Sequence, residues 1–147
     1  MATTSTIPDV SDALVALVTT AMPDVKINDG RPADQNIQFR ELAYLGDTTG
    51  EYSVPVMKSG RRTRSEDYDI QVVVWVAQAR GTLAAAKRRA VELVDGFCDV
   101  LADNPNLGGV SGVLQATAGN IAVSHEFQGE DAVAVATLDV SVSARLN

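Results

Sequence analysis

The sequence predicts an α+β fold, a mostly antiparallel sheet with two helices packed on one of its faces. Residues 8–22 and 82–102 have apolar positions at helical spacing. Residues 68–79 and 132–145 instead alternate at period two, as strands with one covered face do. Since the last third of the chain is β in pattern and only two segments are helical, we expect both helices to cover the same side of the sheet.

Length and composition are those of one globular domain, which we expect to span residues 1–147. Hydrophobic residues make up 46% of the chain, and the formal net charge is -7. An acidic chain repels nucleic-acid phosphates, so a gripping nucleic-acid binder is not expected. The sequence shows no secretory signal, and no apolar run approaches the roughly 20 residues that a helix needs to span a bilayer. We therefore expect a soluble protein of a reducing cytoplasm without a membrane partner.

The first helix is expected at residues 8–22, where the carboxylate of Asp9 can cap free N–H groups and Pro23 ends the helix. The second helix follows Gly81, with Thr82 as its cap. Its apolar stripe consists of Leu83, Ala86, Ala90, Val94, Phe97 and Leu101.

Strands are expected at residues 37–46, 54–60, 68–79, 112–120 and 121–128, and in the segment that starts at Ala132. The small residues on one face of the last strand would let a helix approach closely. Residues 46–67 are expected to form a long loop between the early strands, with Pro55 at a sheet edge because it cannot donate to a ladder.

The second face of the sheet poses a physical problem, because it carries Val73, Trp75, Val133 and Val135. If their strands are neighbours, these side chains form an apolar strip that the two helices cannot cover. Burial of such a strip is favourable at about 25 cal/mol per Å². Either the segment 46–67 folds over the strip or another subunit covers it, and the sequence leaves both alternatives open.

Patterns for catalysis or cofactors are not found. His125 is the single histidine, and its neighbour Ser124 would point to the opposite face of a strand, so the two cannot pair. The glycines of residues 106–113 lack the Gly-Lys-Ser/Thr ending of a phosphate loop. Cys98 lies in an apolar helical pattern, which favours a small buried residue over a reactive thiol. We therefore expect no enzyme, no cofactor and no metal.

Three arginines, Arg61, Arg62 and Arg64, crowd into an otherwise acidic chain. Acidic residues follow at once and partly cancel their field, and no aromatic is interleaved for base stacking. Arginine is favoured at protein interfaces because its planar fork pairs with carboxylates. The cluster is therefore either an interface that meets acidic groups of a neighbouring copy or an exposed loop without a role.

The order of elements in the second half of the chain resembles that of tail terminator (tail completion, minor tail) proteins of long-tailed bacteriophages. The resemblance rests on the strand "YDIQVVVWVAQA", the alanine-rich helix "TLAAAKRRAVELVDGFCDVLADNPNLGG" and the closing "VATLDVSVSARLN". It covers residues 68–147 and, loosely, the first helix. Residues 29–66 match only in being long and variable.

The resemblance implies a structural virion protein, assembled in the host cytoplasm and placed at the head-proximal end of the tail. Such proteins form a ring, typically of six subunits, on the last ring of the tail tube. The ring ends tube growth and presents a surface to the head-tail connector protein. DNA passes through the lumen without specific binding, for which an acidic wall is physically sensible.

On this hypothesis two surfaces are candidate interfaces with the adjacent subunit or the tail tube protein. The first is the segment 46–67 with Arg61, Arg62 and Arg64, and the second is the sheet face at Val73 and Trp75. A head-tail adaptor or stopper subunit is the alternative within the same biology. A small ligand-binding domain, with its pocket between sheet and long loop, is the alternative from another class.

Overall fold

The computed structural model describes residues 4–31, 41–53, 57–58, 61–62 and 64–146. Five strands form a mixed sheet in the order β1-β2-β5-β7-β6, and two short strands form a separate ribbon, β3-β4. The pair β1–β2 is parallel, while β2–β5, β5–β7 and β6–β7 are antiparallel. The elements are α1 (Ile7–Ala21), β1 (Lys26–Asp29), β2 (Glu41–Ser53), β3 (Met57–Lys58), β4 (Arg61–Arg62), β5 (Arg64–Ala79), α2 (Leu83–Asp103), β6 (Val113–Gln128) and β7 (Asp131–Leu146).

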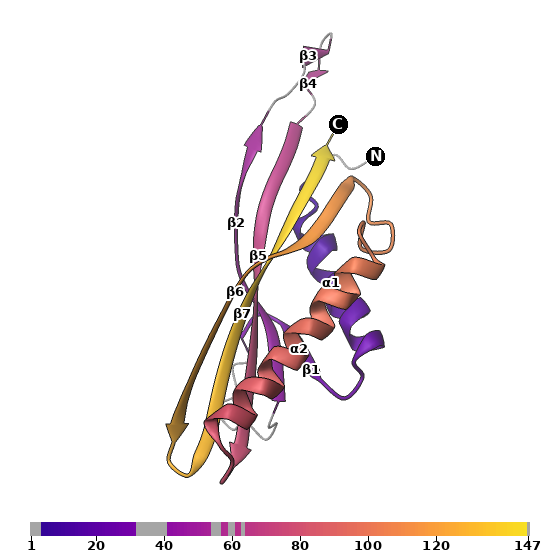
Figure 1. Ribbon diagram of the computed structural model, residues 1–147. Helices are drawn as coiled ribbons and strands as arrows, with labels where there is room; N and C mark the ends of the chain where they lie inside the picture. Colours follow the sequence, from indigo (N-terminus) through magenta and orange to yellow (C-terminus); the bar gives the residue numbers. More distant parts are fainter. Residues whose placement is uncertain (1–3, 32–40, 54–56, 59–60, 63, 147) are drawn as a thin grey trace.

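Both helices lie on the same side of the sheet, which confirms the predicted α+β class (Figure 1). The side chains of Ile70, Val72 and Val74 in the central strand β5 are fully buried and face the helices. Helix α2 packs across β7, β6 and β5, and α1 packs on β1 and α2. We call the helix-bearing side of the sheet the core face and the opposite side the open face.

Helix α2 can lie close to the sheet because small residues meet at their contact. Ala86 and Ala90 of the helix are fully buried, as are Ala134 and Ala136 of β7. Phe97 fills the space further along α2 and is also buried. The predicted cap is confirmed, since the hydroxyl of Thr82 accepts a hydrogen bond of 3.1 Å from the backbone N–H of Ala85.

The start of α1 is fixed from another part of the chain, by the carboxylate of Glu66 in β5. Glu66 Oε1 accepts hydrogen bonds of 2.6 Å from both the backbone N–H and the hydroxyl of Thr6. Glu66 Oε2 accepts a third of 2.9 Å from the hydroxyl of Ser5, and the Tyr68 hydroxyl lies 2.8 Å from Thr6 Oγ1. Although it is charged, Glu66 is only 2% exposed, so these donors replace the water it loses.

The expectation that Asp9 caps the first helix is therefore wrong. The helix begins at Ile7, which places Asp9 inside the first turn, and the N-cap residue is Thr6. Thr6 makes no capping bond with its own side chain. The backbone N–H of Thr6 instead donates to the carboxylate of Glu66, sixty residues away in sequence. No local sequence pattern predicts a partner at that separation.

The predicted loop at residues 46–67 is mostly β structure in its described parts. Strand β2 continues past a register shift between Leu45 and Thr48 and pairs with β5 as far as Ser53. From Asp47 onward the residues of β2 are exposed, apart from half-buried Thr48, so this part of the strand has no apolar alternation and its sequence resembles a loop. The strand expected at residues 37–46 begins at Glu41 in the described part, and Pro55 lies outside the described residues.

The two strands expected at residues 112–120 and 121–128 are one strand, β6. Gly119 and Asn120 are the last two residues of the first expected strand. They lie instead at a register shift between Ala118 and Ile121, where the strand is bulged but continues. The turn expected after it is present, because β6 ends at Gln128 and Gly129 has a φ of 63°.

Substitution of Glu66 by alanine should destabilise the protein, because it leaves the buried N–H and hydroxyl of Thr6 without their acceptor. The expected loss in the free energy of unfolding is about 1–3 kcal/mol, measured by urea denaturation. Glu66→Gln keeps an acceptor oxygen in the same place and is the matched control, with a smaller loss. An alanine variant as stable as the native chain would contradict the assigned role.

The pH dependence of stability should change at Tyr68. Burial raises the pKa of Tyr68 from 10.0 to about 12, and the Glu66 charge adds to the rise, while the hydrogen bond with Thr6 opposes it. The unfolded chain therefore releases this proton first, so stability should fall as pH rises from about 10 towards 12. In Tyr68→Phe the free energy of unfolding, measured by chemical denaturation at several pH values, should no longer fall in this way between about pH 10 and 12. An unchanged pH dependence would exclude the effect.

Candidate functional site

Side chains suited to catalysis or metal binding do not converge in the described part of the chain. His125 is exposed on the core face of β6, opposite Ala134, while Ser124 points to the open face opposite Val135. The two therefore cannot pair, as predicted. Among the described residues no group of three or more His, Cys, Asp and Glu side chains could hold a metal ion. Neither described helix is long and apolar enough to cross a membrane.

The first candidate surface is the end of the β2–β5 hairpin. Strands β3 and β4 pair with each other, Met57 opposite Arg62 and Lys58 opposite Arg61. Figure 1 shows this ribbon standing beyond the end of the five-stranded sheet, away from both helices. We call β3 and β4 the hairpin tip. Arg61 and Arg62 thus lie at the far end of a projecting hairpin.

The third arginine is separated from the other two. Arg64 begins β5 and pairs with Leu146 of β7, so it belongs to the sheet and not to the tip. Its guanidinium carbon lies 4.5 Å from the centre of the Tyr52 ring, a cation–π contact within the chain. Its Nε is buried and has no hydrogen-bond partner among the described residues. Arg64 therefore stiffens the base of the hairpin.

The second candidate surface, the apolar strip on the open face, is formed as the sequence predicts. Trp75 lies opposite Val135. Two residues further along the same strands, Ala77 lies opposite Val133. Val73 and Val133 are buried, and Trp75 and Val135 are half-buried. Of the two alternatives for covering this strip, folding of residues 46–67 over it is wrong for the described part of that segment, because those residues continue the sheet as strands.

The half of the open face nearer the hairpin tip is acidic rather than apolar. Asp67 and Asp69 accept hydrogen bonds of 2.7 Å and 2.6 Å from the hydroxyls of Ser143 and Ser141 in β7. Glu51 of β2 lies directly opposite Asp67, which places like charges on neighbouring strands. Together with Thr49 these side chains line a shallow hollow. The open face thus has an apolar half and an acidic half.

Sequence reasoning missed a groove between the C-terminal half of α2 and the start of β6. Its lining includes Cys98, Leu101, Ala102, Pro105 and Leu114. Leu114 is 61% exposed, the largest exposure among the described large apolar residues. Burial raises the pKa of the Cys98 thiol, and the charges of Asp95 and Asp99 add to the rise, so the thiol stays protonated and unreactive at neutral pH.

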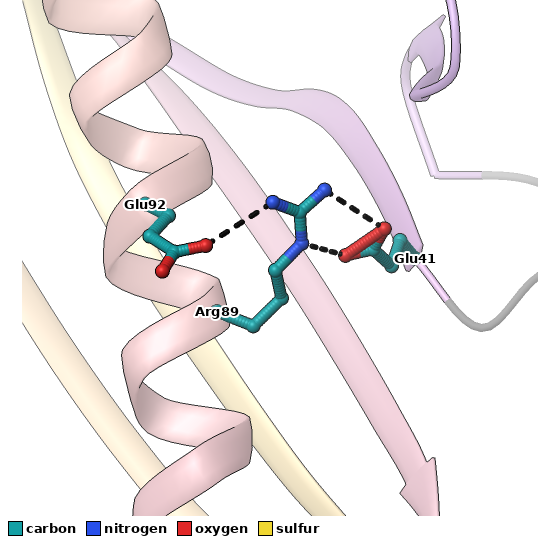
Figure 2. Close-up of polar contacts among 3 residues, drawn as sticks. All are labelled: Glu41, Arg89 and Glu92. Atoms are coloured by element: carbon teal, nitrogen blue, oxygen red, sulfur yellow. Dashed lines mark hydrogen bonds and ion pairs between the residues drawn. The ribbon is translucent and has the colours of Figure 1, made fainter.

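An ion-pair cluster ties α2 to the start of β2 (Figure 2). The guanidinium of Arg89 donates to both carboxylate oxygens of Glu41, one of the bonds being 3.1 Å from Nη2. Its Nη1 donates to Glu92, one turn along the helix, at 3.2 Å. The bond with Glu41 is the main cause of the raised pKa of Arg89. Because Glu41 is 48 residues away, spacing within the helix could predict only the pair with Glu92.

The base of the hairpin should tolerate no side chain at Gly50. A Cβ there would overlap the carbonyl oxygen of Asp67 and the Cβ of Tyr68, which lie in the paired strand. Gly50→Ala should therefore lower the free energy of unfolding by about 1–3 kcal/mol. At Gly46, in the same strand, the nearest atom is the flexible amide oxygen of Gln71 at 2.8 Å, so Gly46→Ala should cost less. Equal stabilities of the two variants in urea would contradict the close approach.

Comparison with known proteins gives structural relatives only. No protein-family model matches the sequence, and no curated protein matches it. The sheath/tube terminator of an extracellular contractile injection system, PVC, in its extended state aligns with a TM-score of 0.55 and 16% sequence identity. That alignment covers 100% of this chain and 58% of the other. At this identity the likeness shows a shared fold and no more.

A chain from the virion of a native gene transfer agent particle aligns more weakly, with a TM-score of 0.44 and 16% identity. The alignment covers 89% of this chain and 84% of that one. The present chain shares the fold of the 58% of the sheath/tube terminator chain with which it aligns.

Proposed function

We propose that this protein is a structural virion subunit that caps a tail tube as a ring, ends tube growth and forms the surface that meets the head connector. The fold shared with a sheath/tube terminator is the observation that carries the proposal. A fold alone does not fix a function, so the surfaces of this chain have to fit the role. The hairpin tip, the open face and the edge strand β6 lie at different parts of the molecule.

A ring of identical subunits needs two different, complementary surfaces on each subunit. The chain offers an edge and a projection. Strand β6 is one edge of the sheet, and in the described sheet it pairs only with β7. Its sixteen residues contain no lysine, arginine or proline, the residues with which monomeric proteins protect a sheet edge. The hairpin tip, at another side, supplies the projection.

The acidic character of the subunit fits a wall past which DNA moves. The formal net charge is -7, and the open face adds a local cluster of Glu51, Asp67 and Asp69. Such a wall repels phosphates and leaves DNA free to slide, whereas a basic wall would retain it. Position at the head-proximal end of the tail, a count of six subunits and assembly in the host cytoplasm belong to the same proposal.

Added to polymerising tail tube protein, this protein should stop growth and shorten the tubes, because a ring at the growing end blocks further addition. Tube lengths are measured by electron microscopy. The double variant Arg61→Glu and Arg62→Glu should leave the tubes as long as in the absence of the protein. Lys87→Glu with Arg88→Glu, at two exposed residues of α2, makes the same charge change and should keep full capping.

Tubes of undiminished length with the native protein would overturn the proposal. Tight binding to the head connector without binding to the tube would identify a stopper or adaptor instead. The single tryptophan supplies a second readout in the same mixtures, since half-buried Trp75 should change its fluorescence if the open face is covered on assembly. An unchanged spectrum in capped tubes would remove the open face from the proposed contacts.

A further inference from the structure

We propose that the hairpin tip of one copy docks in the groove between α2 and β6 of a second copy, where Asp95 and Asp99 receive its positive charges. This inference rests on the proposed ring and names the contact between adjacent subunits. Three observations carry it: an apolar groove, a row of exposed carboxylates on the helix that forms one wall of that groove, and a basic tip built from two short strands.

The groove is apolar where a partner would seat. Leu101 and Cys98 contribute from α2, Pro105 from the turn after it, and Leu114 and Ala116 from β6. Leu114 is exposed while Ala116 is buried, so the wall formed by β6 ends in a large apolar side chain in water. A second chain lying along this strand would cover Leu114 and would meet the edge of β6 outside Ala116, whose backbone N–H already donates to the carbonyl oxygen of Pro105 at 2.7 Å.

The rim of the groove is acidic on its α2 side. Asp95, Asp99 and Asp103 follow one another at one-turn spacing, and all three are exposed. Asp95 and Asp99 lie close enough to Cys98, inside the groove, to raise the pKa of its thiol. Three carboxylates in a row repel one another, and cations placed beside them would relieve this repulsion.

The hairpin tip has the opposite charge, and its two short strands pair with each other. Its strands are two residues each, and a two-stranded ribbon of this size is at best marginally stable in water. Its register places Lys58 directly opposite Arg61, and like charges in that position are destabilising. Carboxylates of a partner would attract both Lys58 and Arg61 and so offset their repulsion. The apolar groove would offer the ribbon a surface on which to pack.

The acidic half of the open face is the competing acceptor, and it fits less well. Its Asp67 and Asp69 already accept hydrogen bonds from Ser143 and Ser141, so part of their capacity is used within the chain. Its hollow is lined mainly by polar groups, with Val142 and Tyr68 as the apolar or aromatic members. The groove at α2 has a mainly apolar lining, and Asp95 and Asp99 lie close to its Cys98, which suits a basic tip that also contains Met57.

Cysteine crosslinking between two variants tests the contact directly. In a Cys98→Ala background, one protein carries Lys58→Cys and the other Ala102→Cys, which lies in the groove and leaves the rim intact. A short bismaleimide should give a mixed dimer when the two proteins are combined at high concentration, with and without tail tubes. Replacing Ala102→Cys by Asp12→Cys, an exposed position on α1, should abolish the mixed dimer.

A charge exchange tests the chemistry of the same contact. Arg61→Glu with Arg62→Glu, and separately Asp95→Lys with Asp99→Lys, should each weaken self-association about tenfold or more, measured by sedimentation. The protein that carries all four changes should recover most of the self-association, because the two surfaces then attract each other with reversed charges. Circular dichroism and thermal unfolding of each variant confirm that it is folded.

Absence of the mixed dimer, or no recovery in the fourfold variant, would overturn this inference. If the native protein still shortens tubes in that case, the proposed function stands and only the docking site is wrong. A mixed dimer together with tubes of undiminished length would support the contact and refute the capping role. The two experiments therefore fail independently.

Discussion

The rest of the structure depends on the long antiparallel ladder between β5 and β7. It runs without a register shift from Arg64 opposite Leu146 to Ala79 opposite Asp131. Because side chains alternate along a strand, this one register sends Ile70, Val72 and Val74 towards the helices and their neighbours to the open face. A slip by a single residue would exchange the two faces and expose the core.

The same ladder explains how one end of the sheet can project. Towards this end β2 is exposed, whereas Glu66 and Tyr68 of β5 stay buried beside the start of α1. Hydrogen bonds and charges take over there: serines of β7 donate to Asp67 and Asp69, and Arg64 stacks on Tyr52. Glu66, on the core face of this region, reaches the start of α1 and ties the base of the hairpin to the helical layer.

The charge of the chain is distributed unevenly, and this gives the molecule its distinct surfaces. Acidic groups gather on one half of the open face and along the outer side of α2. Lys58, Arg61 and Arg62 concentrate positive charge in the hairpin tip. A subunit with separated charges can attract a copy of itself in one orientation while its net charge of -7 disfavours unspecific association. A head-to-tail contact of that kind gives a ring where its rotation closes and an open filament where it does not.

The sequence by itself determined the elements that are covered on one side. Periodicity predicts the two helices, the strand of Ile70 and Trp75, and the apolar strip on the open face. An element that is buried on one side carries apolar residues at the period of its own helix or strand. Only the tertiary structure decided the rest. The partner of the α1 start, the clamp from Arg89 to Glu41, the strand character of the hairpin and the groove at Leu114 all join residues far apart in the chain. Such contacts leave no local period, so they became visible only once the strands were in register.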